Sequence, residues 1–295
     1  MTPDAQDRSA AAIAARATIS RIDALASKHD PVHEGIKVSW RRFGAHTTRP
    51  PLVLLHGGHG SWMHWLRNVE ALSVGRTVWV PDQPGYNESD VPLPAAPGQQ
   101  PVDPLLDALI GTLDALVGAD TTIDLAGFSF GGIVAAKLMQ RRGRVNRLAL
   151  LGSGGHGTRR RMTVEMVNWK SAATRAEERA ALVHNLAALM LHDAASIDAL
   201  AFEIHDISCH GTRFRSRDVS VATGLQEAID AYPNPLLLIW GEHDVTADAR
   251  PLVAQLLEGH PNREGVVVDG AGHWVQFERA DEVNARLLAF FGQGG

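Results

Sequence analysis

Ser129 stands in the segment GFSFGG (127–132), directly after a short apolar run. A strand that turns sharply into a helix at this point would strain the serine backbone and expose its hydroxyl. Gly127 and Gly131 fit such a turn, because side chains two residues either side of the serine would collide there. The segment therefore predicts a nucleophilic serine; the alternative is a structural N-cap behind a glycine turn.

A serine hydroxyl needs a base to take its proton and a carboxylate to orient that base. Asp244 follows the apolar run LLLIW, and His273 follows VVVDGAG, so both stand just past a predicted strand. Taken singly, Asp244 could cap the helix that starts near Thr246, and His273 could be a core histidine. Together, in this chain order, the three residues predict a Ser-His-Asp triad.

The attacked carbonyl oxygen also needs hydrogen-bond donors for its negative charge. One predicted donor is the backbone N–H of Phe130, at the start of the helix after the serine. The other is Gly58, in the glycine-rich loop HGGHGS (56–61). His56 and His59 of this loop have no third ligand and no helical spacing, so we expect no metal site. His56 is instead expected to brace the loop or to contact the substrate.

Three further side chains are candidate substrate contacts. Trp274 follows the predicted base directly, and Arg213 and Arg215 alternate with Arg217 along TRFRSR (212–217). In an extended segment the three arginines would point the same way. One interpretation is a solvated charged edge; the other is an arginine at the pocket mouth that binds a substrate carboxylate through two parallel hydrogen bonds.

The elements that must position these residues alternate between strands and helices. Short apolar runs that end at glycine or proline predict strands at 51–58, 76–85, 121–129, 145–155, 234–244 and 265–273, after an early strand at 36–40. Helices are predicted at 62–73, 104–117, 131–141, 247–258 and 279–291. This alternation indicates an α/β fold with a mostly parallel sheet, whose active site lies beyond the carboxyl ends of the strands.

The alternation stops between 156 and 232, where only helical segments such as 176–192 occur. We therefore expect an N-terminal helical extension (1–30), a core formed by 31–155 and 233–295, and an inserted helical block (156–232). The extension could pack on the protein itself or on a second copy of the chain, so a homodimer is one expected arrangement.

Composition narrows the function classes. A net charge of −5 over 295 residues argues against nucleic acid as a partner. The single cysteine, Cys209, excludes an internal disulfide. No apolar run reaches the roughly 18 residues of a membrane span, and acidic residues near the N-terminus do not fit a signal peptide. We expect a cytoplasmic protein without a membrane partner.

Five motifs together resemble the α/β-hydrolase family over residues 32–291: LLHGGHGS, PDQPGYNES, GFSFGG, WGEHD and GAGHW. The resemblance implies the α/β-hydrolase fold, an eight-stranded, mostly parallel sheet flanked by helices, with 156–232 as a helical cap over the active site. The turn DQPGYNES has Asn87 where the family usually has glycine. Asparagine tolerates positive φ, so we expect the turn to survive.

The expected function is a serine hydrolase that cleaves an ester or other activated acyl carbonyl of a small molecule through an acyl-enzyme, with no cofactor. Within the family, HGGHGSWMHWLRN and the segment from 270 to 291 look most like hydrolases that cleave carbon–carbon bonds in ring-opened aromatic catabolites. Those enzymes carry asparagine before the nucleophile, where this chain has Phe128. Carbon–carbon hydrolysis of a β-diketone-like acid is therefore the second expectation, and a ligand-binding receptor with weak turnover is the alternative from another class.

Overall fold

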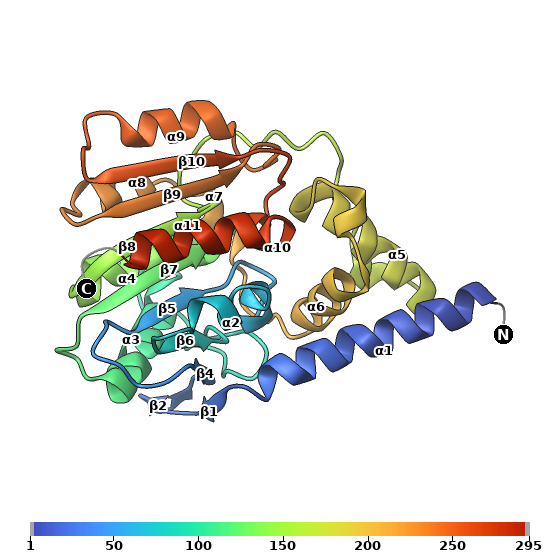
Figure 1. The fold of residues 1–295 in the computed structure, drawn as a ribbon, viewed down its shortest axis with the longest axis horizontal. Helices are drawn as coiled ribbons and strands as arrows, with labels where there is room; N and C mark the ends of the chain where they lie inside the picture. Colours follow the sequence, from blue (N-terminus) through green and yellow to red (C-terminus); the bar gives the residue numbers. More distant parts are fainter. Residues whose placement is uncertain (1–2, 293–295) are drawn as a thin grey trace.

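A computed structural model describes residues 3–292, with side chains from residue 10 onward (Figure 1). The strands are β1 Ser27–His29, β2 Val32–His33, β3 Ile36–Lys37, β4 Trp40–Phe43, β5 Leu52–Leu55, β6 Val78–Pro81, β7 Ile123–Phe128, β8 Val145–Leu151, β9 Leu236–Gly241 and β10 Arg263–Val268. The α-helices are α1 Pro3–Asp23, α2 Val69–Leu72, α3 Asp103–Val117, α4 Phe130–Arg142, α5 Arg175–Asn185, α6 Ala199–His210, α7 Arg217–Val221, α8 Leu225–Asp230, α9 Ala249–Leu257, α10 Val275–Glu278 and α11 Ala280–Gly292.

Eight strands form one sheet in the order β1-β4-β6-β5-β7-β8-β9-β10. The six strands from β6 to β10 run parallel to one another, whereas β4 is antiparallel to both β1 and β6. The predicted fold class, a mostly parallel eight-stranded sheet flanked by helices, is confirmed.

Helices cover both faces of this sheet, which explains why its central strands are apolar along their whole length. Every residue of β5, β7 and β9 is buried. One hydrophobic core joins the sheet to α3, α4, α8 and α9. A second core joins the opposite face to α2, α10 and α11. Parallel strands buried on both faces read as continuous apolar runs, and those runs marked them in the sequence.

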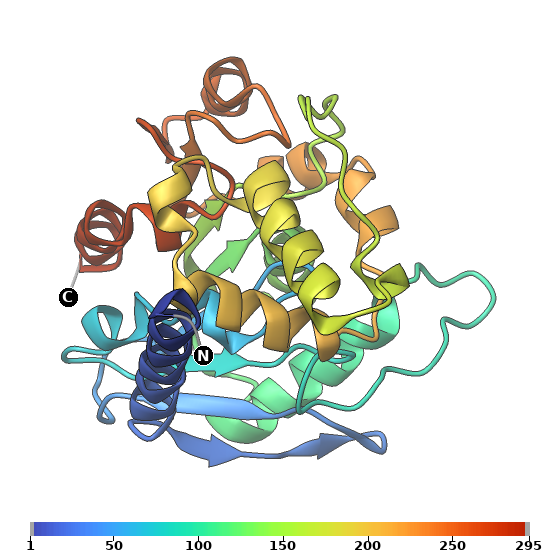
Figure 2. The ribbon, with the colours of Figure 1, turned by 90° about the vertical axis from the view of Figure 1, so that its right-hand side faces the viewer.

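Residues 156–232, called the insertion below, lie between β8 and β9 and form no strand in the structure. The helices α5 and α6 of the insertion lie beyond the carboxyl ends of the strands, in front of the sheet in Figure 2. The predicted helix 176–192 changes from α to π geometry at Leu186 and ends at Met190.

The N-terminal helix α1 packs along α6 of its own chain. Arg16 on α1 forms an ion pair with Glu203 on α6, with Nε and Oε2 2.8 Å apart. Near the end of α1, Ile22 enters the second hydrophobic core. Of the two packing arrangements expected for the extension, the structure shows the one within the chain.

The structure corrects the sequence-based elements at three places. The early strand breaks between β3 and β4, because Val38 donates its N–H to Pro31 and Ser39 donates to the Ser89 hydroxyl. The helix expected at 62–73 is a 3-10 turn, Trp62–Trp65, followed by the single turn α2. The strand β1 was not expected.

No helix within residues 3–292 combines the length and apolar character required to cross a membrane.

Candidate active site

Ser129 lies at the turn between β7 and α4, with φ 54° and ψ −118°. A positive φ is strained for a residue with a side chain, and such strain persists only where the surrounding structure enforces it. The turn places Ser129 at the carboxyl edge of the sheet, directly before the first residue of α4. The predicted strand-turn-helix context of this serine is confirmed.

The glycines around Ser129 are required by close backbone approach. A Cβ atom at Gly127 would lie 2.2 Å from the carbonyl oxygen of Gly131. One at Gly131 would lie 2.4 Å from the carbonyl oxygen of His56, and one at Gly132 would lie 2.7 Å from Cβ of Ser153. The turn therefore excludes side chains at all three positions.

Ser129, His273 and Asp244 form a continuous hydrogen-bonded relay. His273 Nε2 lies 2.8 Å from Ser129 Oγ, and His273 Nδ1 lies 2.8 Å from Asp244 Oδ2. Asp244 follows the end of β9, and His273 follows the end of β10, so the carboxyl ends of β7, β9 and β10 supply the three groups at one edge of the sheet. The structure brings together all three residues of the predicted triad.

Asp244 is buried, and burial alone would raise the pKa of its carboxyl. The His273 ring and two hydrogen bonds from Thr246 oppose this effect, and the net result is a lowered pKa. Thr246 donates its backbone N–H and its hydroxyl to Asp244 Oδ1, at 2.8 and 2.7 Å. Asp244 is therefore ionised at neutral pH, as a group that orients an imidazole must be.

A cavity of about 650 Å³ opens at Ser129 and His273. Its wall combines core residues with residues of the insertion, and six of its side chains form an apolar part of that wall: Phe128, Met162, Val164, Met166, Leu189 and Met190. Gly58, one of the two predicted donors, also lines it. Phe130, the other, is the first residue of α4, where a backbone N–H has no partner inside the helix.

A smaller cavity of about 190 Å³ adjoins the same reactive groups. It shares Ser129, His273, Thr246, Ser220 and Arg160 with the larger cavity. Its other walls are small or polar: Gly152, Gly154, His156, Gly157, Thr158 and Val221. The nucleophile thus stands between a larger compartment with an apolar part to its wall and a smaller compartment with almost no bulky apolar side chain.

The arginines at the site are not the two that were predicted. Arg217 lines the larger cavity, whereas Arg213 and Arg215 line neither one. The expected extended segment stops at Ser216, because Arg217 begins α7. Arg213 turns away and donates to the carbonyl oxygens of Asn87 and Ser89.

Arg160 was missed because it lies in an irregular loop without any repeating pattern. Desolvation and repulsion from the Arg217 guanidinium lower the pKa of Arg160. The two cations therefore lie near one another at the cavity. Neither arginine forms an ion pair within the described part of the chain, whereas the adjacent Arg161 pairs with Asp248.

Two other predicted substrate contacts are corrected. Trp274 is fully buried, stacks on Phe277 with ring centres 4.1 Å apart, and donates its indole N–H to the carbonyl oxygen of His64. His56 is also fully buried and lines neither cavity. The His56 ring packs edge-on against Tyr86, with ring centres 4.8 Å apart, so both side chains face the core. His56 instead braces its loop, the other role expected for it.

The turn that carries Asn87 keeps its shape, since Asn87 adopts φ 38° as expected.

Cys209 is buried, and burial raises the pKa of its thiol to about 12. A thiol with so high a pKa is protonated at neutral pH and is a poor nucleophile.

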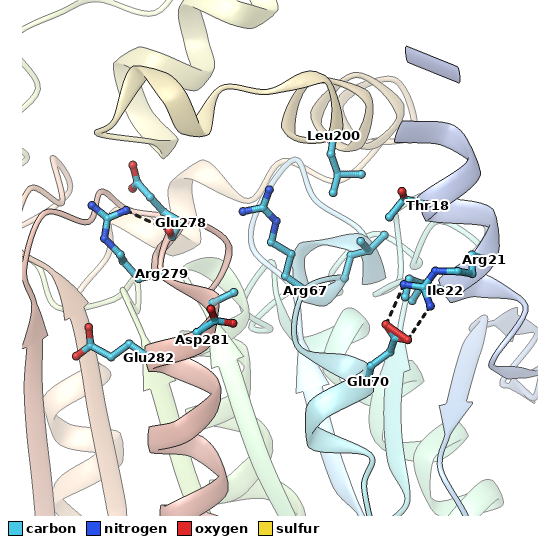
Figure 3. Close-up of a pocket in the computed structure, with 12 residues that line it drawn as sticks. Thr18, Arg21, Ile22, Arg67, Glu70, Leu200, Glu278, Arg279, Asp281 and Glu282 are labelled. Carbon is cyan, nitrogen blue, oxygen red and sulfur yellow. Dashed lines mark hydrogen bonds and ion pairs between the residues drawn. The ribbon is translucent and has the colours of Figure 1, made fainter. Parts of the chain in front are cut away.

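A separate cavity of about 600 Å³ lies between α1, α2 and the start of α11 (Figure 3). Its charged residues are largely paired. Arg21 faces Glu70 through two hydrogen bonds, drawn in Figure 3. Arg67 pairs with Asp198. None of Ser129, Asp244 and His273 lines it.

Comparison with known proteins identifies the family of this chain. The model of the Alpha/beta hydrolase family matches residues 52–286. The chain is 30% identical over 257 residues to 2-hydroxy-6-oxononadienedioate/2-hydroxy-6-oxononatrienedioate hydrolase 1 of Dechloromonas aromatica (strain RCB), covering 81% of this chain and 86% of that protein. It is 29% identical to a hydrolase of the same description from Paraburkholderia phymatum, covering 94% and 99%.

Among solved structures, carboxylesterase CesB (YbfK) of Bacillus subtilis superposes with a TM-score of 0.73 at 18% identity, covering 97% of this chain and 99% of that one. At this identity the similarity establishes the fold alone. Family match, sequence relatives and fold agree, and the chain belongs to the Alpha/beta hydrolase family.

Proposed function

We propose that this hydrolase uses Ser129 as its nucleophile, His273 as general base and acid, and Asp244 to orient His273. The observation that carries the proposal is the relay from Ser129 Oγ through His273 to Asp244, with both links 2.8 Å long, at the wall of a cavity. Such a relay also disfavours the receptor alternative, because a binding protein needs no activated serine.

The chemistry follows from this geometry. Ser129 Oγ attacks the substrate carbonyl carbon while its proton passes to His273 Nε2. The N–H groups of Gly58 and Phe130 are the proposed donors to the resulting oxyanion. His273 then returns the proton to the leaving group, which departs and leaves an acyl-enzyme. Water, deprotonated by His273, attacks the acyl-enzyme. His273 then returns that proton to Ser129 Oγ as the acyl–oxygen bond breaks, which releases the acid and restores both residues.

We propose the insertion as the cap of this site, since its residues Met162 to Met166, Leu189 and Met190 complete the larger cavity. An ester with an apolar acyl chain fits that wall. Phe128 supports this choice, because it places an aromatic ring beside the nucleophile.

Hydrolysis of a carbon–carbon bond is the second candidate. The two sequence relatives described above are named as hydrolases of dioates, compounds with two carboxylates. In this chain Arg160 and Arg217 provide two cations without ion-pair partners at the cavity, among the residues described. A carboxylate on the substrate is the complementary group, so acidity of the substrate is the property that separates the two candidates.

The first prediction tests the nucleophile. Ser129→Ala should lower kcat for a p-nitrophenyl ester by on the order of 10⁴ to 10⁶, since triad members act as a unit. The same variant should resist labelling by an organophosphonate, with its circular dichroism spectrum and thermal unfolding unchanged. Near wild-type turnover by the folded variant would contradict the proposal.

The second prediction tests the arginines with matched substrates, p-nitrophenyl hexanoate and the mono-p-nitrophenyl ester of adipic acid. If the cations bind a carboxylate, Arg160→Ala or Arg217→Ala should raise KM for the acidic ester by about 10- to 100-fold. KM for the neutral ester should stay within about threefold. Arg215→Ala is the matched control, because Arg215 lines neither cavity. Equal kcat/KM values for both esters in all variants would leave the arginines without a role in specificity.

A further inference from the structure

We propose that His56 is a positioning residue that orients the backbone N–H of Gly58 toward the oxyanion. This inference rests on the proposed function, because it concerns the donor loop of that same site. It assigns a role to a buried histidine that touches neither cavity.

The hydrogen bonds of His56 define its protonation. Nε2 lies 3.0 Å from the backbone nitrogen of Gln83, which can only donate, so Nε2 is the acceptor. The proton of a neutral ring is therefore on Nδ1, which donates to the carbonyl oxygen of Gly57 at 2.8 Å. Burial lowers the pKa of His56 to about 4, so this neutral form persists at neutral pH.

The carbonyl of Gly57 and the N–H of Gly58 belong to one peptide unit. No described peptide bond is cis, and in a planar trans unit these two groups point in opposite directions. The carbonyl is held inward, against a ring that is fully buried, while Gly58 lines the cavity. The bond from His56 therefore directs the Gly58 N–H outward, to the side where the substrate carbonyl would lie.

The preceding peptide unit is held as well. Gln83 Nε2 donates to the carbonyl oxygen of His56 at 2.6 Å, and the Gly57 N–H donates to His64 Nδ1 at 3.2 Å. Glycines at 57 and 58 give the loop close approach but no intrinsic rigidity. A donor that is fixed before reaction stabilises a developing charge without reorganisation, so external anchors matter at this loop.

Two substitutions separate the hydrogen bonds of His56. Asparagine places an amide nitrogen near the position of Nδ1, so H56N can still donate to Gly57. Glutamine places its amide near the position of Nε2, so H56Q can accept from Gln83 but cannot hold Gly57. We expect H56Q to lose on the order of 10² in kcat with KM changed less than about threefold, and H56N to lose at least about tenfold less.

Equal losses in H56N and H56Q, or a wild-type kcat in folded H56Q, would overturn the inference. Thermal unfolding of each variant reports whether it folds. If H56Q does not fold, Q83M takes its place: it removes the bond to the His56 carbonyl and should lower kcat by about tenfold at constant KM. A wild-type kcat in Q83M would then overturn the inference.

The Ser129→Ala variant, measured in parallel, distinguishes two failures. An active Ser129→Ala enzyme rejects the proposed function. An inactive one, together with equal losses in H56N and H56Q, rejects only the role of His56.

Discussion

Both carboxylate oxygens of Asp244 are occupied, and each bond has its own consequence. Oδ2 accepts from His273, which fixes the imidazole so that Nε2 faces Ser129. Oδ1 accepts two bonds from Thr246, one from the backbone and one from the hydroxyl. Thr246 thus fixes the rotation of the carboxylate that in turn fixes the base.

The hydroxyl of Thr246 can be removed without changing the shape of the side chain. We expect Thr246→Val to lower kcat by about tenfold, because the carboxylate loses one of the bonds that orient it.

Thr246→Ser keeps the hydroxyl and serves as the control for that variant. Steady-state kinetics of both variants at about pH 7.5 measure the change in kcat. If Thr246→Val and Thr246→Ser have the same kcat, the hydroxyl does not orient Asp244.

Single residues differ in how far the sequence predicts them. Ser129, Asp244 and His273 were predictable because each follows a buried apolar run that ends at a turn. Arg160 was not, since its loop has no periodicity and its place at the cavity depends on how the insertion folds back. Trp274 directly follows His273 in the sequence, but its side chain is buried in the core and does not line the cavity.

At the scale of elements, Glu278 joins the insertion to the loop that carries His273. Its carboxylate accepts three backbone N–H groups, from His192 and Asp193 after the π-helix and from Gly272 beside the base. The backbone N–H of Trp274 also donates to the carbonyl oxygen of Met190, at 2.7 Å. The wall formed by Leu189 and Met190 is therefore fixed relative to His273.

Replacing this carboxylate by an amide should loosen that junction. Glu278→Gln offers one acceptor oxygen instead of two and turns an NH₂ group toward backbone donors. We expect a loss of about 1–3 kcal/mol in the free energy of unfolding.

We also expect kcat/KM to fall more for p-nitrophenyl hexanoate than for p-nitrophenyl acetate, because only the longer chain reaches the Met190 wall. Glu282→Gln is the control, since Glu282 lies on α11 and pairs with Arg286 at the surface. Equal falls for both esters would argue against a link between the insertion and the base.

The elements themselves show why part of the fold was predictable. β5, β7 and β9 are apolar throughout because both of their faces are buried, and such runs are visible in a sequence. β1, with the sequence Ser-Lys-His, has no apolar pattern and is a strand only because it pairs with β4. Its existence depends on tertiary contacts, which local propensity does not report.

Across the whole molecule, several titratable groups are buried far from solvent. Burial lowers the pKa of His56 and of His205 from 6.5 to about 4, and it lowers that of His64 well below 6.5. Burial also raises the pKa of Asp82 from 3.8 to about 6, although Arg41 opposes this shift. These groups make the stability of the fold depend on pH in a predictable direction.

The sign differs between the two kinds of group. For the histidines the folded-state pKa lies below the unfolded one, so the unfolded chain binds more protons as the pH falls from about 6.5 toward 4, and stability decreases. For Asp82 the folded-state pKa lies above the unfolded one, so acidification from about pH 6 stabilises the fold. His56 and His205 together outweigh the single carboxyl.

We therefore expect the free energy of unfolding in urea to fall by about 3 kcal/mol or more between about pH 7.5 and pH 5, since each of these two histidines removes about 2 kcal/mol and Asp82 restores about 1. His205→Gln should show a smaller fall, by about 2 kcal/mol, because it lacks one of the titrating rings. His46→Gln, at an exposed position, should behave like the wild type. Equal stability at the two pH values, or a fall in His205→Gln as large as in the wild type, would mean that these histidines accept protons within the folded protein.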